Sequence, residues 1–273
     1  MLEEYLKRVF NDERPSHNAA RRVAEHIVSG DVDAETAGKF LATLAREGET
    51  IPEIGGFMET IKKDRLKIDL GAPAGDVCGT GGGRRARFNT STVVALVAAA
   101  AGCPVAKLCG GGSQAKNGSI NFVEAIGCNV AGLDELLREA FRRFNLCYLD
   151  ARRFLPALVH FREARKFAKC RTVINLAAPL CNPALIDYRL LGTTDKETAQ
   201  ILASILSTYP GLKRAWVVVG NNGVDELTVL GVSRIYVVEN GRFAQTHFHP
   251  RLLGAGVRQG VPCWGNAHKN ARK

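Results

Sequence analysis

The sequence predicts an α/β protein: a small N-terminal helical domain, then a larger α/β domain in which helices flank a mostly parallel central sheet. Before residue 70, apolar residues recur at helical spacing and β-branched runs are almost absent. From about residue 74, short apolar runs alternate with helical segments, which is the pattern of an α/β domain. The 273 residues, 46% of them hydrophobic, suffice for a substantial core. We therefore expect the helical domain over residues 1–70 and the α/β domain over residues 71–273.

The helical domain carries recognisable helix-start signals. Asp33 precedes a helix with Glu35 in its first turn, and Thr50 and Glu53 form a capping box around Pro52. The apolar faces of its helices are marked by Leu2, Tyr5, Leu6, Val9, Ala20, Val23, Ile27, Ala37, Phe40, Leu41 and Leu44. These features predict structure and name no chemistry.

Glycines and turn residues separate the elements expected in the α/β domain. A strand over residues 74–78 leads into a glycine loop, and a helix over residues 92–101 follows. The other expected strands cover residues 105–108, 147–149, 172–176 and 215–219, and residues 233–238 and 242–246 form a hairpin through Asn240-Gly241. Residues 265–273 resemble the first turns of a helix without a cap. Either this tail is short and frayed, or the α/β domain lacks its last elements.

The charge of the chain favours an anionic partner. A net charge of +10 and a pI near 9.4 suit either a phosphorylated metabolite or a nucleic acid. The alternative is a surface that charge merely keeps soluble, because many basic residues alternate with acidic ones along expected helices. The longest apolar run, residues 93–101, is about half of a membrane span, and the N-terminus has no signal-peptide pattern. We expect a soluble cytoplasmic protein with no membrane partner.

The cysteine pattern argues against a metal cluster or a disulfide framework. No two cysteines form a C-x-x-C motif, and most have apolar neighbours. We expect reduced core thiols, as in a cytoplasmic protein. The eight positions are Cys78, Cys103, Cys109, Cys128, Cys147, Cys170, Cys181 and Cys263.

Residues 76–92, DVCGTGGGRRARFNTST, combine glycines with three arginines and four hydroxyl side chains. Their spacing fits neither a P-loop nor a dinucleotide-binding fingerprint. A strand, glycines that permit close backbone approach, and Asn89-Thr90-Ser91-Thr92 at a helix start predict an anion site, because helix N-termini attract anions. The hydroxyls there can bind phosphate oxygens or Mg²⁺. The alternative is a tight strand-to-helix turn with a Ser/Thr cap and no ligand.

The order of several motifs separates these alternatives. The chain contains Gly79-Thr80-Gly81-Gly82, Asn89-Thr90-Ser91-Thr92, Lys107 before a second glycine loop, Lys116-Asn117-Gly118-Ser119, Arg171-Thr172-Val173-Ile174-Asn175, Pro179-Leu180-Cys181-Asn182-Pro183 and Val224-Asp225-Glu226-Leu227. In this order they resemble anthranilate phosphoribosyltransferases. The similarity covers nearly the whole chain, including FLATLAREGETIPEI at residues 40–54. That family shares its fold with pyrimidine nucleoside phosphorylases.

The resemblance implies an architecture and a reaction. The helical domain would take further helices from about residues 155–190, be joined by hinges to the α/β domain around an active-site cleft, and form homodimers. The reaction would transfer phosphoribose from phosphoribosyl diphosphate to anthranilate, a step of tryptophan biosynthesis, with Mg²⁺ as cofactor. Breaking the anomeric C–O bond builds negative charge on the departing diphosphate, so amides, hydroxyls and a metal must hold it. No protein nucleophile is needed.

The same resemblance implies which residues form the site. Ser91, Asp225 and Glu226 match the magnesium positions, and an adjacent acidic pair suits hard oxygen coordination, although such pairs are often only solvated. Arg165 stands where the family has an arginine that faces the anthranilate carboxylate; alternatively, it is one more arginine on the basic helix 162–169. The substrate-binding residues expected besides Arg165 are Gly79, Gly82, Gly83, Arg87, Asn89, Thr90, Ser91, Thr92, Lys107 and Ser119.

The chain also departs from the family pattern in both loops. In the first loop, Gly83 and Arg84 replace a usual Asp-Gly pair, and Arg87 replaces a threonine that touches phosphate. In the second, residues 107–111 read Lys-Leu-Cys-Gly-Gly where the family has Lys-His-Gly-Asn-Arg. Gln114 and Asn121 stand where serine and aspartate are usual.

Two interpretations of these departures compete. In one, Arg84, Arg85 and Arg87 move positive charge into the first loop, so a phosphorylated ligand is still held while the acceptor pocket has changed. In the other, the ancestral activity is lost and a basic cleft binds nucleic acid; Phe88 alone among aromatic residues accompanies the arginines, which weakens base stacking. Hydrolysis is disfavoured, because no histidine lies near a glycine-flanked nucleophile.

Overall fold

The computed structural model describes residues 2–11, 13–81, 88–110, 118–128, 130 and 132–254. The chain divides into two compact units. The first, here called the helical unit, combines residues Met1–Lys67 with Ala151–Pro183, and the second, the α/β unit, combines Ile68–Asp150 with Ala184–Lys273. None of the helices in the part that the structure describes has the length and apolar character of a membrane span.

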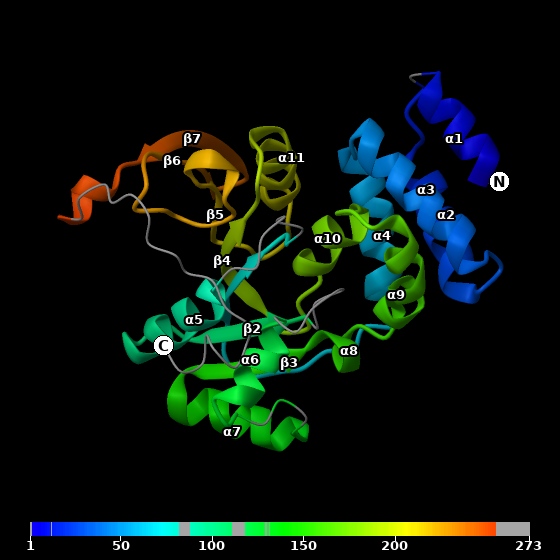
Figure 1. The fold of residues 1–273 in the computed structure, drawn as a ribbon. Helices are drawn as coiled ribbons and strands as arrows, with labels where there is room; N and C mark the ends of the chain where they lie inside the picture. Colours follow the sequence, from blue (N-terminus) through cyan, green and yellow to red (C-terminus); the bar gives the residue numbers. More distant parts are fainter. Residues whose placement is uncertain are drawn as a thin grey trace. The chain divides into compact units, whose positions relative to one another are not determined.

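The helical unit is built from two separate stretches of sequence. Its elements are α1 (Leu2–Phe10), α2 (His17–Ser29), α3 (Ala34–Glu47), α4 (Ile51–Lys63), α8 (Ala151–Phe154), α9 (Ala157–Ala168), α10 (Val173–Ala177) and the 3₁₀ turn η1 (Ala178–Leu180). Helix α9 packs against α2, α3 and α4, and α10 packs against α3 and α4, so the second stretch completes the core of the first (Figure 1).

The expected caps of the helical unit are confirmed. The Asp33 carboxylate accepts a hydrogen bond from the Thr36 N–H at 2.9 Å and so caps α3. At the start of α4, Glu53 Oε2 accepts from the Thr50 N–H at 2.8 Å and from the Thr50 hydroxyl at 2.7 Å. The Thr50 hydroxyl and the Glu53 carboxylate thus bracket the free amides of the first turn, which is the role of a capping box.

The α/β unit contains one seven-stranded sheet in the order β3-β2-β1-β4-β5-β6-β7. The strands from β3 to β5 run parallel, and β6 and β7 are antiparallel additions at one edge. The strands are β1 (Ala74–Gly79), β2 (Val105–Cys109), β3 (Leu146–Asp150), β4 (Ile186–Gly192), β5 (Arg214–Val219), β6 (Ser233–Glu239) and β7 (Arg242–Phe248). The remaining elements are α5 (Thr90–Ala100), α6 (Ser119–Ala125), α7 (Asp134–Phe144), α11 (Lys196–Ser207), η2 (Asn221–Gly223) and η3 (Pro250–Leu253).

Helices pack on the sheet on both sides of its central strand. Helix α5 contacts β1, β2 and β3, and α11 contacts β5, β6 and β7 (Figure 1). Under α5, a buried cluster includes Ala95, Val105, Cys109 and Tyr148, with Ile120 and Val123 from α6. The predicted fold class, a helical N-terminal part followed by a mostly parallel α/β sheet flanked by helices, is confirmed.

Two expectations about secondary structure are wrong. Residues 172–176, expected as a strand, instead form the start of α10 in the helical unit. The cause is local capping: Thr172 and Asn175 form a second capping box, which turns a β-branched run into a helix. Conversely, β4 over residues Ile186–Gly192 was not expected, because Asp187 and Arg189 interrupt its apolar pattern although both are buried.

The expected hairpin is confirmed. Strands β6 and β7 pair antiparallel through Asn240 and Gly241, whose positive φ angles of 52° and 72° suit a tight two-residue turn.

Seven cysteines lie in the described part of the chain and all are free thiols. Cys103 and Cys170 are exposed, so the expectation of core thiols is wrong for these two; both lie in connecting segments outside the helices and strands.

The contact between α2 and α4 depends on a glycine. A Cβ atom on Gly56 would lie 2.6 Å from both the Arg21 N and the His17 O, which are backbone atoms of α2. On the neighbouring Gly55, a Cβ would meet only the imidazole of His17, at 2.8 Å. The first obstacle is rigid backbone and the second is the end of a movable side chain.

We predict that Gly56→Ala lowers the free energy of unfolding by about 1–3 kcal/mol, because the helices must separate. Gly55→Ala is the matched control: its better helix propensity, about 1 kcal/mol, should leave stability unchanged or raised. Urea unfolding followed by circular dichroism measures both values. Equal effects of the two substitutions would contradict a backbone contact at Gly56.

Candidate active site

The carboxyl ends of β1 and β4 form the centre of the candidate site. The chain order runs outward from β1 through β2 and β3 on one side and returns to β4 on the other. In open α/β sheets, ligands bind at such a switch point, beyond the carboxyl ends of the strands. Gly79 ends β1 opposite Gly192, which ends β4, and the Thr80 N–H donates to Gly192 O at 2.8 Å.

The loop after β5 folds back over these two strand ends. A Cβ on Gly79 would lie 2.8 Å from Asp225 Oδ2, and a Cβ on Gly192 would overlap the Asp225 carbonyl oxygen. Asn222 and Gly223, with φ angles of 59° and 68°, turn the loop, and the Gly220 N–H donates to Val224 O at 2.7 Å. The half-buried Asp225 carboxylate is thereby held against the end of β1, and Glu226 follows it directly.

The start of α5 supplies amide and hydroxyl groups. Asn89 precedes the first helical residue, Thr90, and its carbonyl accepts from the Thr92 and Val93 N–H groups at 2.9 and 3.2 Å. Within the residues that the structure describes, the buried Thr92 Oγ1 has no hydrogen-bond partner. An anion bound at this helix N-terminus would satisfy the Thr92 hydroxyl.

Lys107 connects β2 to the start of α5. Its side chain is buried, and its ammonium donates hydrogen bonds to Val77 O of β1 and to Ser91 Oγ, the latter at 3.1 Å. The structure therefore brings together two of the residues expected in the site, Lys107 and Ser91. A buried ammonium beside a helix N-terminus makes this region electropositive.

Ser119 and Arg165 belong to other helices, α6 and α9. Ser119 is the first residue of α6, and no hydrogen bond within the described residues joins it to Lys107 or Ser91. Arg165 belongs to α9 in the helical unit, where its Nη2 donates to Asn175 Oδ1 at 3.4 Å. Burial lowers the pKa of the Arg165 guanidinium from its usual value, but arginine stays charged at physiological pH. The same Asn175 oxygen accepts from the Thr172 N–H, so the capping box of α10 also orients Arg165.

Several expected site residues lie outside the described part of the chain. They are Gly82, Gly83 and Arg87, together with Arg84, Arg85 and most of the second glycine loop, residues 111–117.

The acidic and hydroxyl groups of the site fit magnesium by their chemistry. Asp225, Glu226 and Ser91 offer oxygen donors only, and Mg²⁺ is commonly bound through one or two carboxylates while it keeps several waters. Among the described residues, no group of three or more His, Cys, Asp or Glu side chains forms a cluster that would hold a metal by itself. A Mg²⁺ ion here would therefore be shared with a ligand such as a diphosphate.

Thr193 and a buried ion pair below the site were not among the residues expected from the sequence. Thr193 follows β4, and its hydroxyl lies 3.4 Å from that of Thr80, both in buried residues. Arg189 of β4 and Asp76 of β1 form a buried ion pair below the site, with Nη1 and Oδ2 3.3 Å apart. A signal did exist: Gly192-Thr193-Thr194 ends an apolar run in the same way as Gly79-Thr80.

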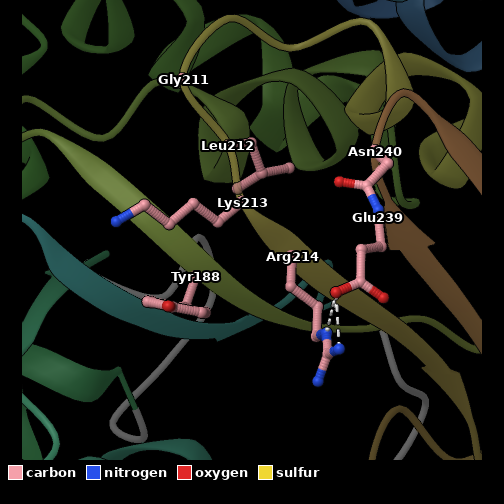
Figure 2. Close-up of a pocket in the computed structure, with 7 residues that line it drawn as sticks. All are labelled: Tyr188, Gly211, Leu212, Lys213, Arg214, Glu239 and Asn240. Atoms are coloured by element: carbon pink, nitrogen blue, oxygen red, sulfur yellow. Dashed lines mark hydrogen bonds and ion pairs between the residues drawn. The ribbon is translucent and has the colours of Figure 1, made fainter.

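A surface groove at the other end of the sheet is a separate feature. It has a volume of about 600 Å³ and lies near the amino ends of β4 and β5. Its cations are already paired: Arg214 with Glu239 at 2.6 Å (Figure 2), and Lys213 with Asp187, also at 2.6 Å. The lining residues are Tyr188, Gly211, Leu212, Lys213, Arg214, Glu239 and Asn240. Parallel α/β sheets place ligands at the opposite edge, so this groove is not the candidate site.

Both parts of the chain match family models of glycosyl transferases. The helical bundle domain of the glycosyl transferase family matches residues 3–63, and the a/b domain of that family matches residues 71–273. The anthranilate phosphoribosyltransferase of Petrotoga mobilis is 32% identical over 255 residues, which cover 93% of this chain and 74% of that protein. The one from Brevibacillus brevis is 34% identical over 274 residues, covering 100% of this chain and 80% of that protein.

Solved structures agree with the sequence matches. The crystal structure of anthranilate phosphoribosyltransferase from Thermus thermophilus is 31% identical, with a TM-score of 0.81 over 98% of this chain and 80% of that one. The Saccharomyces cerevisiae enzyme, solved in complex with PRPP and Mg, has a TM-score of 0.84 at 23% identity and covers 99% of this chain and 79% of its own. The second likeness concerns the fold alone. From the two domain models and the relatives above 30% identity, the chain belongs to the anthranilate phosphoribosyltransferase family.

Proposed function

We propose that the protein transfers the phosphoribosyl group of phosphoribosyl diphosphate to anthranilate, with Mg²⁺ bound to the diphosphate. The observation that carries this proposal is the packing of the Asp225 carboxylate against Gly79, at the end of β1 where the loop toward α5 begins. The Lys107 ammonium, the Ser91 hydroxyl and the buried Thr92 hydroxyl belong to the same end of the sheet. These groups are suited to a ligand that is anionic and binds metal.

The proposed residues act on the departing diphosphate. During transfer the anomeric C–O bond breaks, the nitrogen of anthranilate bonds to the same carbon, and the amine loses a proton. Negative charge accumulates on the diphosphate, and the amides of the first turn of α5, the Ser91 and Thr92 hydroxyls and Lys107 would stabilise it. Mg²⁺, held by Asp225, Glu226 and Ser91, would supply further charge neutralisation.

The acceptor side rests on Arg165. We infer that its guanidinium, oriented by Asn175, pairs with the carboxylate of anthranilate. The family's usual histidine and asparagine are absent here: Leu108 stands in place of the histidine and Gly110 in place of the asparagine. Leu108 is a buried residue of β2, and its N–H donates to Asp76 Oδ1. Binding of the aromatic amine would therefore depend more on Arg165 than in the typical family pattern.

We also infer a cytoplasmic homodimer that forms through the helical unit. Helix α9 exposes Val159 and Phe167, with 56% and 50% of their surface accessible, and a second copy would cover such apolar side chains. Light scattering of the purified protein measures the mass of the assembly.

Isothermal titration calorimetry with phosphoribosyl diphosphate and Mg²⁺ tests the diphosphate side. We expect Mg²⁺-dependent binding that Asp225→Ala weakens by about tenfold or more, equivalent to about 1.4 kcal/mol. Glu135→Gln is the matched control, because Glu135 is an acidic residue of the same unit that is exposed on α7. Release of diphosphate on addition of anthranilate then reports the transfer itself.

Absence of any Mg²⁺-dependent binding to the wild-type protein would overturn the proposed function. In that case the net charge of +10 directs the next measurement to nucleic acid. Binding to generic DNA or RNA in a gel shift would then fall steeply with rising salt, because it would rest on phosphate contacts.

A second substitution tests the packing at the end of β1. We predict that Gly79→Ala weakens Mg²⁺-dependent binding by about tenfold, or about 1.4 kcal/mol, because the new methyl group displaces the Asp225 carboxylate. The control is Gly75→Ala in the same strand, where a Cβ would approach nothing closer than Pro104 O at 3.5 Å. Equal binding by the two variants would show that the position of Asp225 does not matter.

A further inference from the structure

A buried set of charges lies below the candidate site, across the neighbouring strands β2, β1 and β4. Asp76 of β1 and Arg189 of β4 form an ion pair 3.3 Å apart, and their side chains are 0% and 1% exposed. The other carboxylate oxygen of Asp76 accepts from the Leu108 N–H of β2, also at 3.3 Å. Lys107 precedes Leu108 in β2, and its ammonium donates hydrogen bonds to Val77 O and Ser91 Oγ.

Lys107 lies next to this pair along both strands: its ammonium bonds to the carbonyl of Val77, which follows Asp76, and Leu108, which follows Lys107, donates its N–H to Asp76. The pKa of the neighbouring Cys78 thiol is raised to about 12 by burial and by the charge of Asp76, while Arg189 and Lys107 act in the opposite direction. The thiol therefore stays protonated and adds no charge of its own. The set consists of two cations, Arg189 and Lys107, and one anion, Asp76.

One buried carboxylate near two cations creates a competition. Attraction between charges in a buried region is strong, and a buried carboxylate without a cation is unfavourable. In the structure, Arg189 satisfies Asp76 and the Lys107 ammonium remains on Ser91. Without Arg189, the Lys107 ammonium is the other cation in the set and would be drawn toward Asp76.

We propose that Arg189 is a positioning residue for phosphoribosyl transfer: it pairs with Asp76 and so leaves the Lys107 ammonium beside Ser91 at the diphosphate site. This inference rests on the proposed function and adds a residue that touches no substrate. Arg189 acts through Asp76 and Lys107. It also explains why β4, the strand opposite β1, carries a buried arginine.

The test compares Arg189→Gln with the double variant Asp76→Asn/Arg189→Gln. In the single variant, we expect the crystal structure to show the Lys107 ammonium moved from Ser91 to Asp76. The KM for phosphoribosyl diphosphate should rise by about tenfold, with a smaller change in kcat. In the double variant the carboxylate is gone, so Lys107 should return to Ser91 and the KM should return to within about threefold of the wild-type value.

Two further variants complete the experiment. Arg214→Gln removes an arginine from an exposed ion pair of the same unit and should leave the KM unchanged. Asp76→Asn alone, which covers the case in which Arg189→Gln does not fold, should also leave Lys107 on Ser91 and the KM unchanged. A raised KM in Asp76→Asn would instead assign the effect to Asp76 itself and overturn the proposal.

The outcomes separate the positioning role from a structural one. If Arg189 only stabilises the fold, Arg189→Gln lowers the melting temperature and the active fraction while the KM stays the same. A KM that rises in Arg189→Gln and is not restored in the double variant would also overturn the proposal. If the wild-type protein does not bind phosphoribosyl diphosphate, the proposed function fails, and the position of Lys107 in the crystal structures still decides whether Arg189 controls it.

Discussion

Parallel pairing of β1 with β4 is the constraint on which the candidate site depends. Their last residues, Gly79 and Gly192, are 113 positions apart in sequence and lie opposite each other in the sheet. Because the chain leaves β1 toward β2 and returns to β4, these two strands form a switch point, and open α/β sheets bind ligands beyond the carboxyl ends of the strands at such a point. The close approach of the Asp225 loop to both glycines then closes this region on one side.

The electrostatics of the site follow from the same pairing. Asp76 and Arg189 meet only because β1 and β4 are neighbours, and Lys107 reaches Ser91 because β2 lies on the other side of β1. Below the surface, Asp76 and Arg189 form an ion pair, and the Lys107 ammonium donates to Ser91. Many surface cations form exposed ion pairs instead, such as Arg142 with Glu139. Such exposed pairs contribute little field at a distance.

Several elements were predictable because their signals are local. The capping box of α4, the Asn240-Gly241 hairpin and the strand that leads into the first glycine loop each depend on residues within a few positions of one another. Where two local signals conflicted, the prediction failed: residues 172–176 are β-branched, yet the hydrogen bonds of Thr172 and Asn175 start a helix. Strand β4 was missed because its polar residues, Asp187 and Arg189, find their partners elsewhere in the fold.

By itself, the sequence determined the fold class and the family, and it predicted the residue types of an anion site, because motif order and hydrophobic period are properties of the chain. Only the tertiary structure decided which of those residues meet. It paired Gly79 with Gly192, brought Asp225 against the end of β1, directed Lys107 to Ser91 and assigned Arg165 to the helical unit. Sequence spacing cannot supply such contacts, because strand order and buried charge pairing are set by the packing of the whole sheet.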